Sequence, residues 1–580
     1  MKRSLRSRRF VLLSVTFVVS FCSFAYEFVY SELLTVMYGG TVTQYVITVG
    51  LYFFSLGIGA GLSDDLGADR PANFFRTEVY LATVAPAGFL LVVALNSVTL
   101  PSWIPAAVVW VLARLPVIAV GVLSGFELPL LTRMVQETDE DPSSIGGVTG
   151  RVSTLGRRGL ELFWHTHSSG ETRSGLSVVL ALDYIGGLAG AVVYARLLYP
   201  RLGLVTTTVV LSLINAVTAL VFLVRFSERW GVGGGGTGLS FATEPRVLLV
   251  VCLLLTAGHA GALTHHKRLD NQVTEMYLEQ KMEAEYAPGT MKTEVLNQKT
   301  TKYQHLVRYR RTWTASSSNP YFTGRAEQCL RLGMDVQLCE SWADSYHNGL
   351  VDVPMSMYEH TPDTEVLVIG GGDWIAIDHL RSYNVSVDQV DLDAQFMNHT
   401  KRTPFFREWH NDSYTYSRLN TTVEDGYTHL QRTDKQYDLI LLDVPGASDD
   451  DLLKLYSTEF YRLLRTHLTD GGLVGTWLYS PNTHPQHHKA YTNTLREAGF
   501  TQQLPYSAWE DTDSDGRTER VERFSLLAPT ARGPIDTGRT AYVRRYAERY
   551  ETTQWEPVPR YAGVRSNSIF HPNYDIIVDR

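Results

Sequence analysis

The sequence predicts two kinds of structure in one chain: a multi-pass α-helical membrane domain, then a Rossmann-like α/β domain with a small β-unit in front of it. Three observations predict this. Apolar segments of membrane-spanning length recur through residues 1–266, most of the charge lies in residues 267–580, and strand and helix patterns alternate from residue 365. A uniform soluble enzyme and a disordered chain are excluded, because 11% of the residues are aromatic and long apolar stretches need burial or lipid.

The charge of the chain excludes a nucleic-acid-binding function. The 580 residues carry 52 Lys and Arg against 60 Asp and Glu, a formal net charge of −8, and basic residues do not gather among aromatic ones. The four cysteines form no CxxC pair, so a cysteine-based metal site is not expected. We expect the lipid bilayer and small molecules as partners and no nucleic acid. The sequence does not fix the oligomeric state, and a homo-oligomer remains open.

Seven segments have the length and apolar character of membrane spans. They are residues 10–37, 41–62, 79–101, 104–128, 176–198, 203–224 and 247–264. The first is too long for a removed signal peptide and lacks a small-residue cleavage site. The sequence therefore predicts a membrane domain over residues 1–266.

Basic residues predict the orientation of these spans. They gather in the N-terminal flank and in alternate loops, whereas the opposite loops carry only Arg201. The protein is therefore expected in the cell membrane with a cytoplasmic N-terminus. Seven spans then place the C-terminal domain outside the cytoplasm.

Two further patterns favour the extracytoplasmic side. Four asparagines, Asn384, Asn398, Asn411 and Asn420, begin N-x-[ST] sequons. Cys329 and Cys339 lie symmetrically about Met334, as cross-strand partners in a hairpin would, and could form a disulfide. Chance sequons and two reduced thiols are the alternative interpretation.

Ionisable residues lie inside the predicted spans: Glu27, Glu127 and Asp183, with Arg114 as an available partner. A carboxylate at membrane depth needs a partner, a proton or a water-filled cavity. One interpretation is a path for a cation or a polyamine. The other is hydrogen bonding between helices, helped by close packing at the small residues of 186–191.

The extramembrane part begins with a linker and a small β-unit over residues 267–350. Residues 269–285 are typical of a charged helix, Pro288–Gly289 of a turn, and 301–313 and 329–339 of short strands. Residues 351–580 then predict a parallel, doubly wound sheet. Its expected strands are EVLVIG, VDQVD, YDLILLD and GLVGTWLYS, with an amphipathic helix over 452–468.

The run IGGGD is the first chemical signal. Gly370, Gly371 and Gly372 follow a strand, where they let the backbone turn tightly and approach a ligand at a helix N-terminus. Asp391 ends the next strand, 18 residues beyond Asp373, where an acid can accept hydrogen bonds from both ribose hydroxyls. The run is not G-x-G-x-x-G, so a nucleoside without a pyrophosphate is expected.

The motifs GGGD, VDLD, EDGYTHL, YDLILLDVP and LYSTEFYRLL, with YQ at 303–304 and YH at 346–347, resemble the spermidine synthase family of aminopropyltransferases. The resemblance covers about residues 301–500. GFELPLL and DYIGGLAG extend it to the membrane-embedded branch. It implies a class I methyltransferase-type fold and transfer of an aminopropyl group from decarboxylated S-adenosylmethionine to putrescine or a related amine, leaving methylthioadenosine. Decarboxylated S-adenosylmethionine is then a co-substrate, and no tightly bound cofactor is expected.

The resemblance also implies a role for each matching residue. The glycine loop 370–372 and Gln304 match nucleoside contacts, and Asp391 matches the acid on the ribose. Asp425 and Gly426 match the pair at the adenine, His347 and Asp373 match polyamine contacts, and Asp443 matches the proton acceptor. Acids suit this chemistry, because both substrates are cations and the attacking amine must lose a proton.

The amine side departs from the family pattern. Gly446 stands where the family has a second acid after Asp443, a place that Asp449, Asp450 or Asp451 could fill. Trp342, Ala343 and Asn348 replace acids, and Trp374 replaces a glycine and is expected to crowd the pocket. These departures predict a different or bulkier amine acceptor, or a nucleoside-binding protein with little catalysis.

Residues 511–522, DTDSDGRTERVE, match a calcium-loop pattern. Oxygen ligands would come from Asp511, Asp513, Asp515 and Glu522, with Gly516 at the turn. Strand-like flanks are not typical of an EF-hand, and a solvated acidic hairpin tip is the alternative.

The leading hypothesis is therefore a membrane-embedded aminopropyltransferase. The alternative is a polyamine transporter or a polyamine and nucleoside sensor, in which Glu27, Glu127 and Asp183 line the path.

Overall fold

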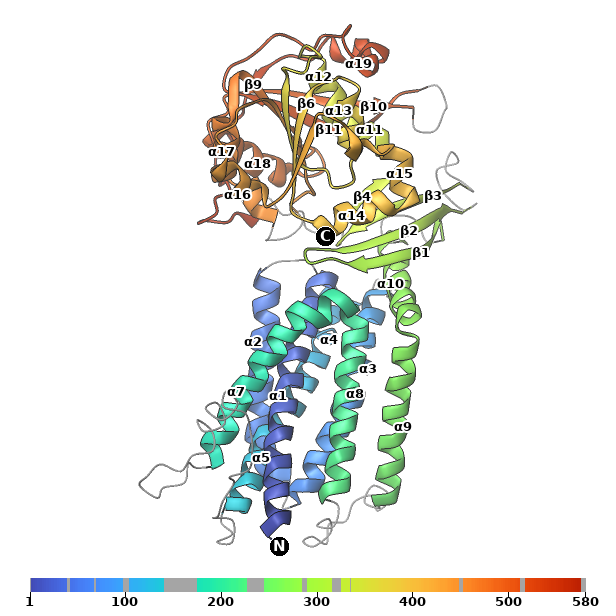
Figure 1. Ribbon diagram of the computed structural model, residues 1–580, viewed down its shortest axis with the longest axis vertical. Helices are drawn as coiled ribbons and strands as arrows, with labels where there is room; N and C mark the ends of the chain where they lie inside the picture. Colours follow the sequence, from blue (N-terminus) through green and yellow to red (C-terminus); the bar gives the residue numbers. More distant parts are fainter. Residues whose placement is uncertain are drawn as a thin grey trace. The chain divides into compact units, whose positions relative to one another are not determined.

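The computed structural model describes residues 2–38, 42–66, 69–97, 104–139, 175–226, 245–283, 289–314, 325–333, 335–447, 452–511 and 517–574. These residues form two compact units. One is helical and ends at Glu285, and the other, from Tyr286 to Arg580, holds all the described strands. Figure 1 shows both units.

The helical unit consists of long apolar helices. They are α1 (Lys2–Tyr38), α2 (Val42–Leu62), η1 (Ser63–Leu66), α3 (Arg70–Ser97), α4 (Ala106–Leu112), α5 (Leu115–Asp139), α7 (Gly175–Val193), the π-helical η3 (Tyr194–Leu198), α8 (Tyr199–Phe226), α9 (Pro245–Thr264) and α10 (His266–Glu283). The sequence groups α10 with the small β-unit, but in the structure it packs against α3 and α8.

Small residues let these helices pack closely. α1 lies against α7, and α2 against α5. A Cβ atom at Gly190 would overlap the carbonyl oxygen of Phe21, and one at Gly125 would overlap that of Leu56. Helices that pack without a hydrophobic driving force gain most from such close backbone approach.

Within the described part of the chain, five helices are long and apolar enough to cross a membrane, or six if the bent pair α9–α10 counts as one span. Each of the seven predicted spans overlaps a described helix, although residues 98–101 of the third lie outside the described residues. The difference in count arises at Leu176–Phe226, a continuous 51-residue helical stretch. Gly203 breaks its helical geometry, and Figure 1 shows α7 and α8 running in opposite directions from that region. At 1.5 Å per residue this stretch measures ~75 Å, enough to cross an apolar core of about 30 Å twice.

The buried acids of the helical unit bond to neighbouring helices. Ser20 donates to Asp183, and Asn215 Nδ2 donates to Glu78 Oε2 at 2.8 Å. Glu78 is also an electrostatic neighbour of Glu127, and the sequence analysis missed it because the predicted span began at residue 79. The expectation that Arg114 pairs with these acids is wrong. Its guanidinium stacks on Trp110 and donates to Gln44 Oε1 at 2.6 Å.

The second unit begins with a four-stranded antiparallel sheet, in the order β1 (Met291–Thr300), β2 (His305–Trp313), β3 (Ala326–Leu332) and β4 (Asp335–Cys339). Cys329 and Cys339 lie directly opposite each other on β3 and β4 and form a disulfide, as their spacing predicts. Leu306, Leu330 and Leu338 pack this sheet on the α/β core through Ile375 and Phe396.

The larger sheet has eight strands in the order β12-β10-β11-β9-β8-β5-β6-β7. They are β5 (Glu365–Gly370), β6 (Ser386–Asp391), β7 (Leu419–Val423), β8 (Tyr437–Asp443), β9 (Leu468–Trp477), β10 (Gln502–Glu510), β11 (Glu519–Ala528) and β12 (Glu556–Pro557). Strands β5 to β9 are parallel, and the β10–β11 hairpin adds antiparallel to β9. This is the predicted doubly wound, Rossmann-like sheet.

Alternating side chains of the central strands fill two separate cores. Val366 and Leu439 enter the core under α13, whereas Leu367 and Ile440 enter the one under α17 and α18. Strands buried on both faces are therefore almost continuously apolar, as EVLVIG and YDLILLD are.

Short helices cover both faces (Figure 1). They are α11 (Ala343–His347), the π-helical η6 (Asn348–Asp352), α12 (Val353–Met355), α13 (Ile375–Arg381), α14 (Ala394–Arg402), α15 (Pro404–His410), η7 (Ser413–Thr415), α16 (Gly426–Arg432), η8 (Leu452–Tyr456), α17 (Thr458–Thr466), α18 (Pro485–Glu497), α19 (Ala541–Arg545) and α20 (Ala547–Tyr550).

Candidate active site

The chain order of the sheet reverses between β5 and β8. β5 is followed by α13 on one face, whereas β8 is followed by α17 on the other. Gly370 and Asp443, which end these two strands, are paired in register. Open α/β sheets bind ligands at the carboxyl ends of the strands at such a switch point. The fold thus places the glycine loop and the predicted proton acceptor at one crevice.

The glycine loop wraps closely around Asp443. Gly370 and Gly371 have φ angles of 92° and 69°, and a Cβ at Gly370 would overlap the Asp443 carbonyl oxygen. The amide of Gly371 donates to that same oxygen at 3.0 Å. A Cβ at Gly372 would lie 2.8 Å from Asp391 Oδ2. Only glycine lets the backbone pass between these two carboxylates.

The positions of two side chains around the loop, Gln389 and Trp374, differ from what the sequence predicts. Gln389 Nε2 donates to the carbonyl oxygens of Gly370 and Gly371, at 3.2 and 2.6 Å, and so fixes the loop from inside β6. The expectation that Trp374 crowds the pocket is wrong, because its side chain turns into the core, where Nε1 donates to the carbonyl of Met397. Trp374 keeps a left-handed φ of 72°, a conformation that favours glycine.

His347, Asp373 and Asp443 converge beside this loop. One side-chain nitrogen or oxygen atom from each residue lies within 4.8 Å of the others, and His347 Nε2 is 3.6 Å from Asp443 Oδ2. His347 Nδ1 donates to the carbonyl of Ala343 at 2.8 Å, which directs Nε2 at the carboxylates. Nε2 of His347 and Oδ2 of Asp443 are both buried without a hydrogen bond among the described residues. Two buried polar atoms aimed at one point are what a bound amine would satisfy.

Charge governs the protonation of this cluster. Burial lowers the pKa of His347, but the adjacent Asp443 carboxylate, helped by Asp373, outweighs it and raises the pKa to about 9. Burial raises the pKa of Asp373 to about 6, with His347 opposing the shift and Asp443 adding to it. At neutral pH an imidazolium therefore sits between two carboxylates.

Asp391 lies at the end of β6, next to the loop. Its Oδ1 accepts the amide of Asp393 at 2.7 Å, and burial raises its pKa to about 7, with Asp393 and Asp373 contributing in the same direction. Gln304 reaches this region from the β1–β2 turn, where its Nε2 donates to Asp393 Oδ2 at 3.3 Å. The small sheet therefore contributes a residue to the nucleoside side.

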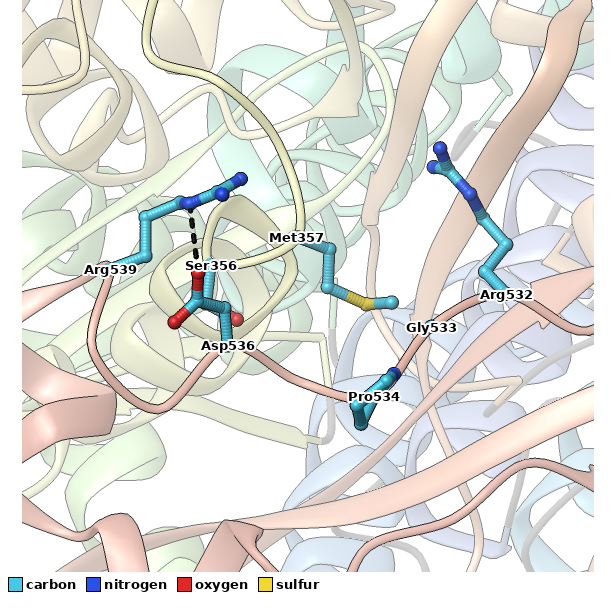
Figure 2. A pocket seen from close by; sticks show the side chains of 7 residues that line it. All are labelled: Ser356, Met357, Arg532, Gly533, Pro534, Asp536 and Arg539. Atoms are coloured by element: carbon cyan, nitrogen blue, oxygen red, sulfur yellow. Dashed lines mark ion pairs between the residues drawn. The ribbon is translucent and has the colours of Figure 1, made fainter.

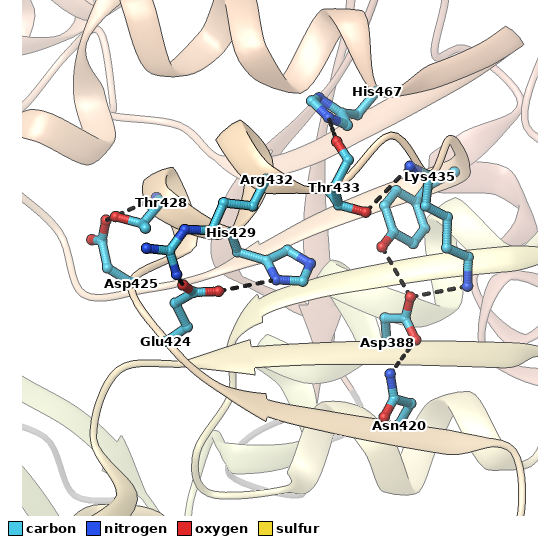
Figure 3. A network of polar contacts seen from close by, with 11 residues as sticks. Asp388, Asn420, Glu424, Asp425, Thr428, His429, Arg432, Thr433, Lys435 and His467 are labelled. Atoms are coloured by element: carbon cyan, nitrogen blue, oxygen red, sulfur yellow. Dashed lines mark hydrogen bonds and ion pairs between the residues drawn. The ribbon is translucent and has the colours of Figure 1, made fainter.

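Asp425 and Gly426 start α16 at the end of β7. Asp425 Oδ1 accepts from the amide of Thr428 at 2.9 Å and from Lys454 Nζ at 2.8 Å. Gly426 is buried against Ile369, where a Cβ would lie 2.7 Å from Cγ2. Figure 3 shows Asp425 bonded to Thr428 and, separately, Glu424 bonded to Arg432 and His429. Both sets of contacts join the residues that follow β7 to α16 and so fix Asp425.

The amine side has fewer acids than the family pattern. Trp342 precedes α11, Ala343 is buried in it, and Asn348 begins η6, so none supplies a carboxylate. Asp344, the one acid of α11, is exposed. Asp449, Asp450 and Asp451, the predicted substitutes, lie outside the described residues.

The predicted calcium site gains no support. Asp513 and Asp515 lie outside the described residues, while Asp511 follows β10. Glu519 pairs with Glu510, the residue before Asp511, whereas Glu522 pairs with Ala508, three residues farther along β11. Three residues span ~10 Å along a strand, whereas two ligands of one calcium ion lie within about 5 Å of each other.

A cavity of about 260 Å³ lies elsewhere in the α/β unit (Figure 2). Arg532 and Arg539 flank it, with Met357 and Pro534 between them, and Arg539 is paired with Asp536. The residues that line it come before β5 and after β11 in the chain. Because β11 runs antiparallel to β9, the cavity lies at the amino ends of the parallel strands, opposite the glycine loop. It is separate from the crevice described above.

The sequence analysis overlooked Gln389 and gave Tyr346 no role beyond its place in the YH motif. The signal for Gln389 was available, because a lone amide inside a buried strand needs a partner. The position of Tyr346 gave no signal of its own, because an aromatic residue on α11 is equally typical of a core.

Residues 343–509 match the family of the spermine/spermidine synthase domain, and this range contains the glycine loop, Asp391 and the His347–Asp373–Asp443 cluster. This part of the chain is therefore similar to the spermine/spermidine synthase domain, which confirms the resemblance drawn from the motifs of the α/β unit.

Curated polyamine aminopropyltransferases are similar over most of the chain. Polyamine aminopropyltransferase 1 of Streptomyces coelicolor is 28% identical over 497 residues, covering 85% of this chain and 80% of the relative. The enzyme of Leptospira interrogans is 24% identical over 485 residues, covering 83% and 82%. Both matches are longer than the α/β unit, so the similarity extends into the helical unit. Among solved structures, spermidine synthase from Thermotoga maritima matches 46% of this chain and 80% of its own, with 15% identity and a TM-score of 0.33.

Proposed function

We propose that this protein is a polyamine aminopropyltransferase, which transfers an aminopropyl group from decarboxylated S-adenosylmethionine to putrescine or a related amine. The observation that carries the proposal is the convergence of His347, Asp373 and Asp443 beside the glycine loop and Asp391. An anionic pocket for an amine thus adjoins a glycine-lined crevice for a nucleoside.

The nucleoside half holds the sulfonium substrate. The ribose hydroxyls donate to Asp391, the glycine loop admits the nucleoside close to the backbone, and Gln304 with Asp425 and Gly426 completes the pocket. The loop between β5 and α13 brings the sulfonium near Asp373, whose carboxylate favours a positive charge.

The amine half carries out the proton transfer. Asp443 accepts a proton from the attacking ammonium, and Asp373 and His347 hold the nitrogen in line. The nitrogen lone pair then forms a bond to the propyl carbon attached to sulfur. The carbon–sulfur bond breaks, its electron pair stays on sulfur, and methylthioadenosine leaves as a neutral thioether.

The full chain, purified in detergent, tests this proposal. Incubation with decarboxylated S-adenosylmethionine and putrescine should yield spermidine and methylthioadenosine in equal amounts, measured by liquid chromatography and mass spectrometry. Asp443→Asn should lower kcat by about 100-fold or more, because the ammonium loses its base. Absence of methylthioadenosine with every di- and polyamine offered to the wild type would exclude this function.

The placement of the α/β unit is a further part of the proposal. The predicted seven crossings, the basic flanks and the Cys329–Cys339 disulfide together favour the side of the membrane opposite the N-terminus.

A further inference from the structure

The amine half of the site has carboxylates for one ammonium group. Asp373 and Asp443 flank the position of the attacking nitrogen, and α11, which covers it, directs no acid inward. A diamine brings a second ammonium, and a buried cation without an anionic partner is costly. Another carboxylate on a neighbouring element would complete the site.

The β10–β11 hairpin brings such a carboxylate to the same face. Glu522 pairs with Ala508 and lies two residues before Phe524, and successive β-strand side chains alternate between faces. The Phe524 ring and the Ala508 side chain both press on Gly349, in the π-helical turn after His347. Glu522 therefore projects from β11 on the face that α11 and η6 cover.

Tyr346 connects Glu522 to the reacting groups. Its ring centroid lies 5.4 Å from that of Phe524 and 5.1 Å from that of His347. Burial raises the pKa of Tyr346, and the carboxylates of Asp443, Glu522 and Asp373 raise it further, in that order. Three acids from three separate elements thus surround one tyrosine.

Glu522 is a largely buried carboxylate whose charge is only partly balanced. Burial raises its pKa; the amide of the next residue, Arg523, which Oε1 accepts at 2.8 Å, and the Arg523 charge oppose this shift without cancelling it. Among the residues that the structure describes, no lysine, arginine or histidine forms an ion pair with Glu522. An ammonium beside it would be its partner.

We propose that Glu522 binds the distal ammonium of the amine acceptor, which makes the site selective for aliphatic di- and polyamines over monoamines. The proposal rests on the proposed function and adds a specificity-determining residue to it. It also gives the acid at the end of the 511–522 motif a role that does not involve calcium.

Putrescine and butylamine test this directly, because they share a four-carbon chain and differ in the second amine. In the wild type, kcat/KM for putrescine should exceed that for butylamine by about 100-fold or more, since sites built for a polar group reject the analogue that lacks it. Glu522→Gln should raise the putrescine KM by about 10-fold or more and reduce this preference to within about 10-fold. The KM for decarboxylated S-adenosylmethionine should stay within about twofold, and Glu522→Asp should restore part of the preference.

Glu548→Gln, at an exposed position on α20, is the matched control and should leave both rates unchanged. An unchanged preference in a folded Glu522→Gln variant would overturn the inference and leave the proposed function standing. If the wild type makes no product, the proposed function fails. Calorimetric binding of putrescine in the presence of methylthioadenosine then decides the inference: Kd about 10-fold weaker in Glu522→Gln supports it, and equal affinity or no binding overturns it.

Discussion

His347 occupies the position where the amine substrate must place its own charge. Asp443, Asp373, Tyr346 and His379 face it, and the two carboxylates stabilise its imidazolium form. The pKa of His347 is raised to about 9. Below that pH, His347 carries a proton whose positive charge takes the place of the charge of the amine. Amine binding and release of this proton are therefore linked.

We predict that kcat/KM for putrescine rises about 10-fold per pH unit toward pH 9 and then levels, because neutral His347 leaves both carboxylates to the amine. His347→Gln should remove the inflection near 9 and leave the ionisation of the amine itself, near pH 10. Steady-state rates between pH 6.5 and 10 measure both profiles. The same inflection in His347→Gln would assign it to another group.

Asp391 provides a second pH-dependent contact. Its pKa is raised to about 7, and only the ionised form, which predominates above that pH, accepts hydrogen bonds from both ribose hydroxyls. Methylthioadenosine should therefore bind more tightly as pH rises through 7. Asp391→Asn should weaken binding by about 10- to 100-fold and abolish the pH dependence. Calorimetry measures both, with the exposed Asp363→Asn as control; an affinity independent of residue 391 would rule out ribose binding there.

At the scale of elements, the loop from β5 to α13 determines the geometry of the site. Gly370 pairs with Asp443, and Gln389 on β6 holds the carbonyl oxygens of the loop. Asp443, the glycine loop and Asp373 are thus fixed by three adjacent strand ends. Sites built on strand ends are held more rigidly than sites on free loops.

Gly370→Ala should destabilise the α/β unit by ~3 kcal/mol or more, because the new Cβ overlaps backbone and the φ of 92° disfavours it. That loss corresponds to a melting temperature lower by roughly 6–12 °C in the detergent-purified chain. Gly533→Ala, where a Cβ meets open space, is the control and should melt like the wild type. Equal melting of the two variants would show that the loop adopts another backbone.

The β10–β11 hairpin shows how a motif can mislead when its strands are not known. The spacing of 511–522 indicates a calcium loop, but pairing in β10 and β11 draws Glu522 away from Asp511. Register decides which side chains meet, and register depends on the partner strand rather than on the motif.

At the scale of the whole molecule, the crossings of the helical unit determine on which side the α/β unit lies. α9 and α10 meet at 79°, a bend that fits either a complete last span or a re-entrant one. A complete span gives an odd number of crossings and separates the α/β unit from the N-terminus; a re-entrant one returns it to the same side.

Ala531→Cys tests this, because residue 531 is exposed and the native cysteines are either buried or joined in the disulfide. We expect a membrane-impermeant maleimide to label the variant in intact cells and the wild type to stay unlabelled. Labelling only after lysis would place the α/β unit in the cytoplasm, make α9 re-entrant and exclude the topology that we propose.

The sequence by itself determined the class of both units and the position of the glycine loop. Span-length apolar runs, strands buried on both faces and the glycine loop are local patterns, and local patterns fix local structure. The pairing of Cys329 with Cys339 could also be predicted, because ten residues of hairpin leave one register that joins them.

Only the tertiary structure decided which acids share a site. His347, Asp373 and Asp443 come from three elements, and no spacing along the chain shows that they meet. The side chain of Trp374 lies in the core, and Arg114 donates to the amide of Gln44. Neither could be predicted, because side-chain direction and pairing depend on what packs against each residue. The ionisation of His347 follows from the same fact, since the adjacent carboxylate of Asp443, on a different element, raises its pKa.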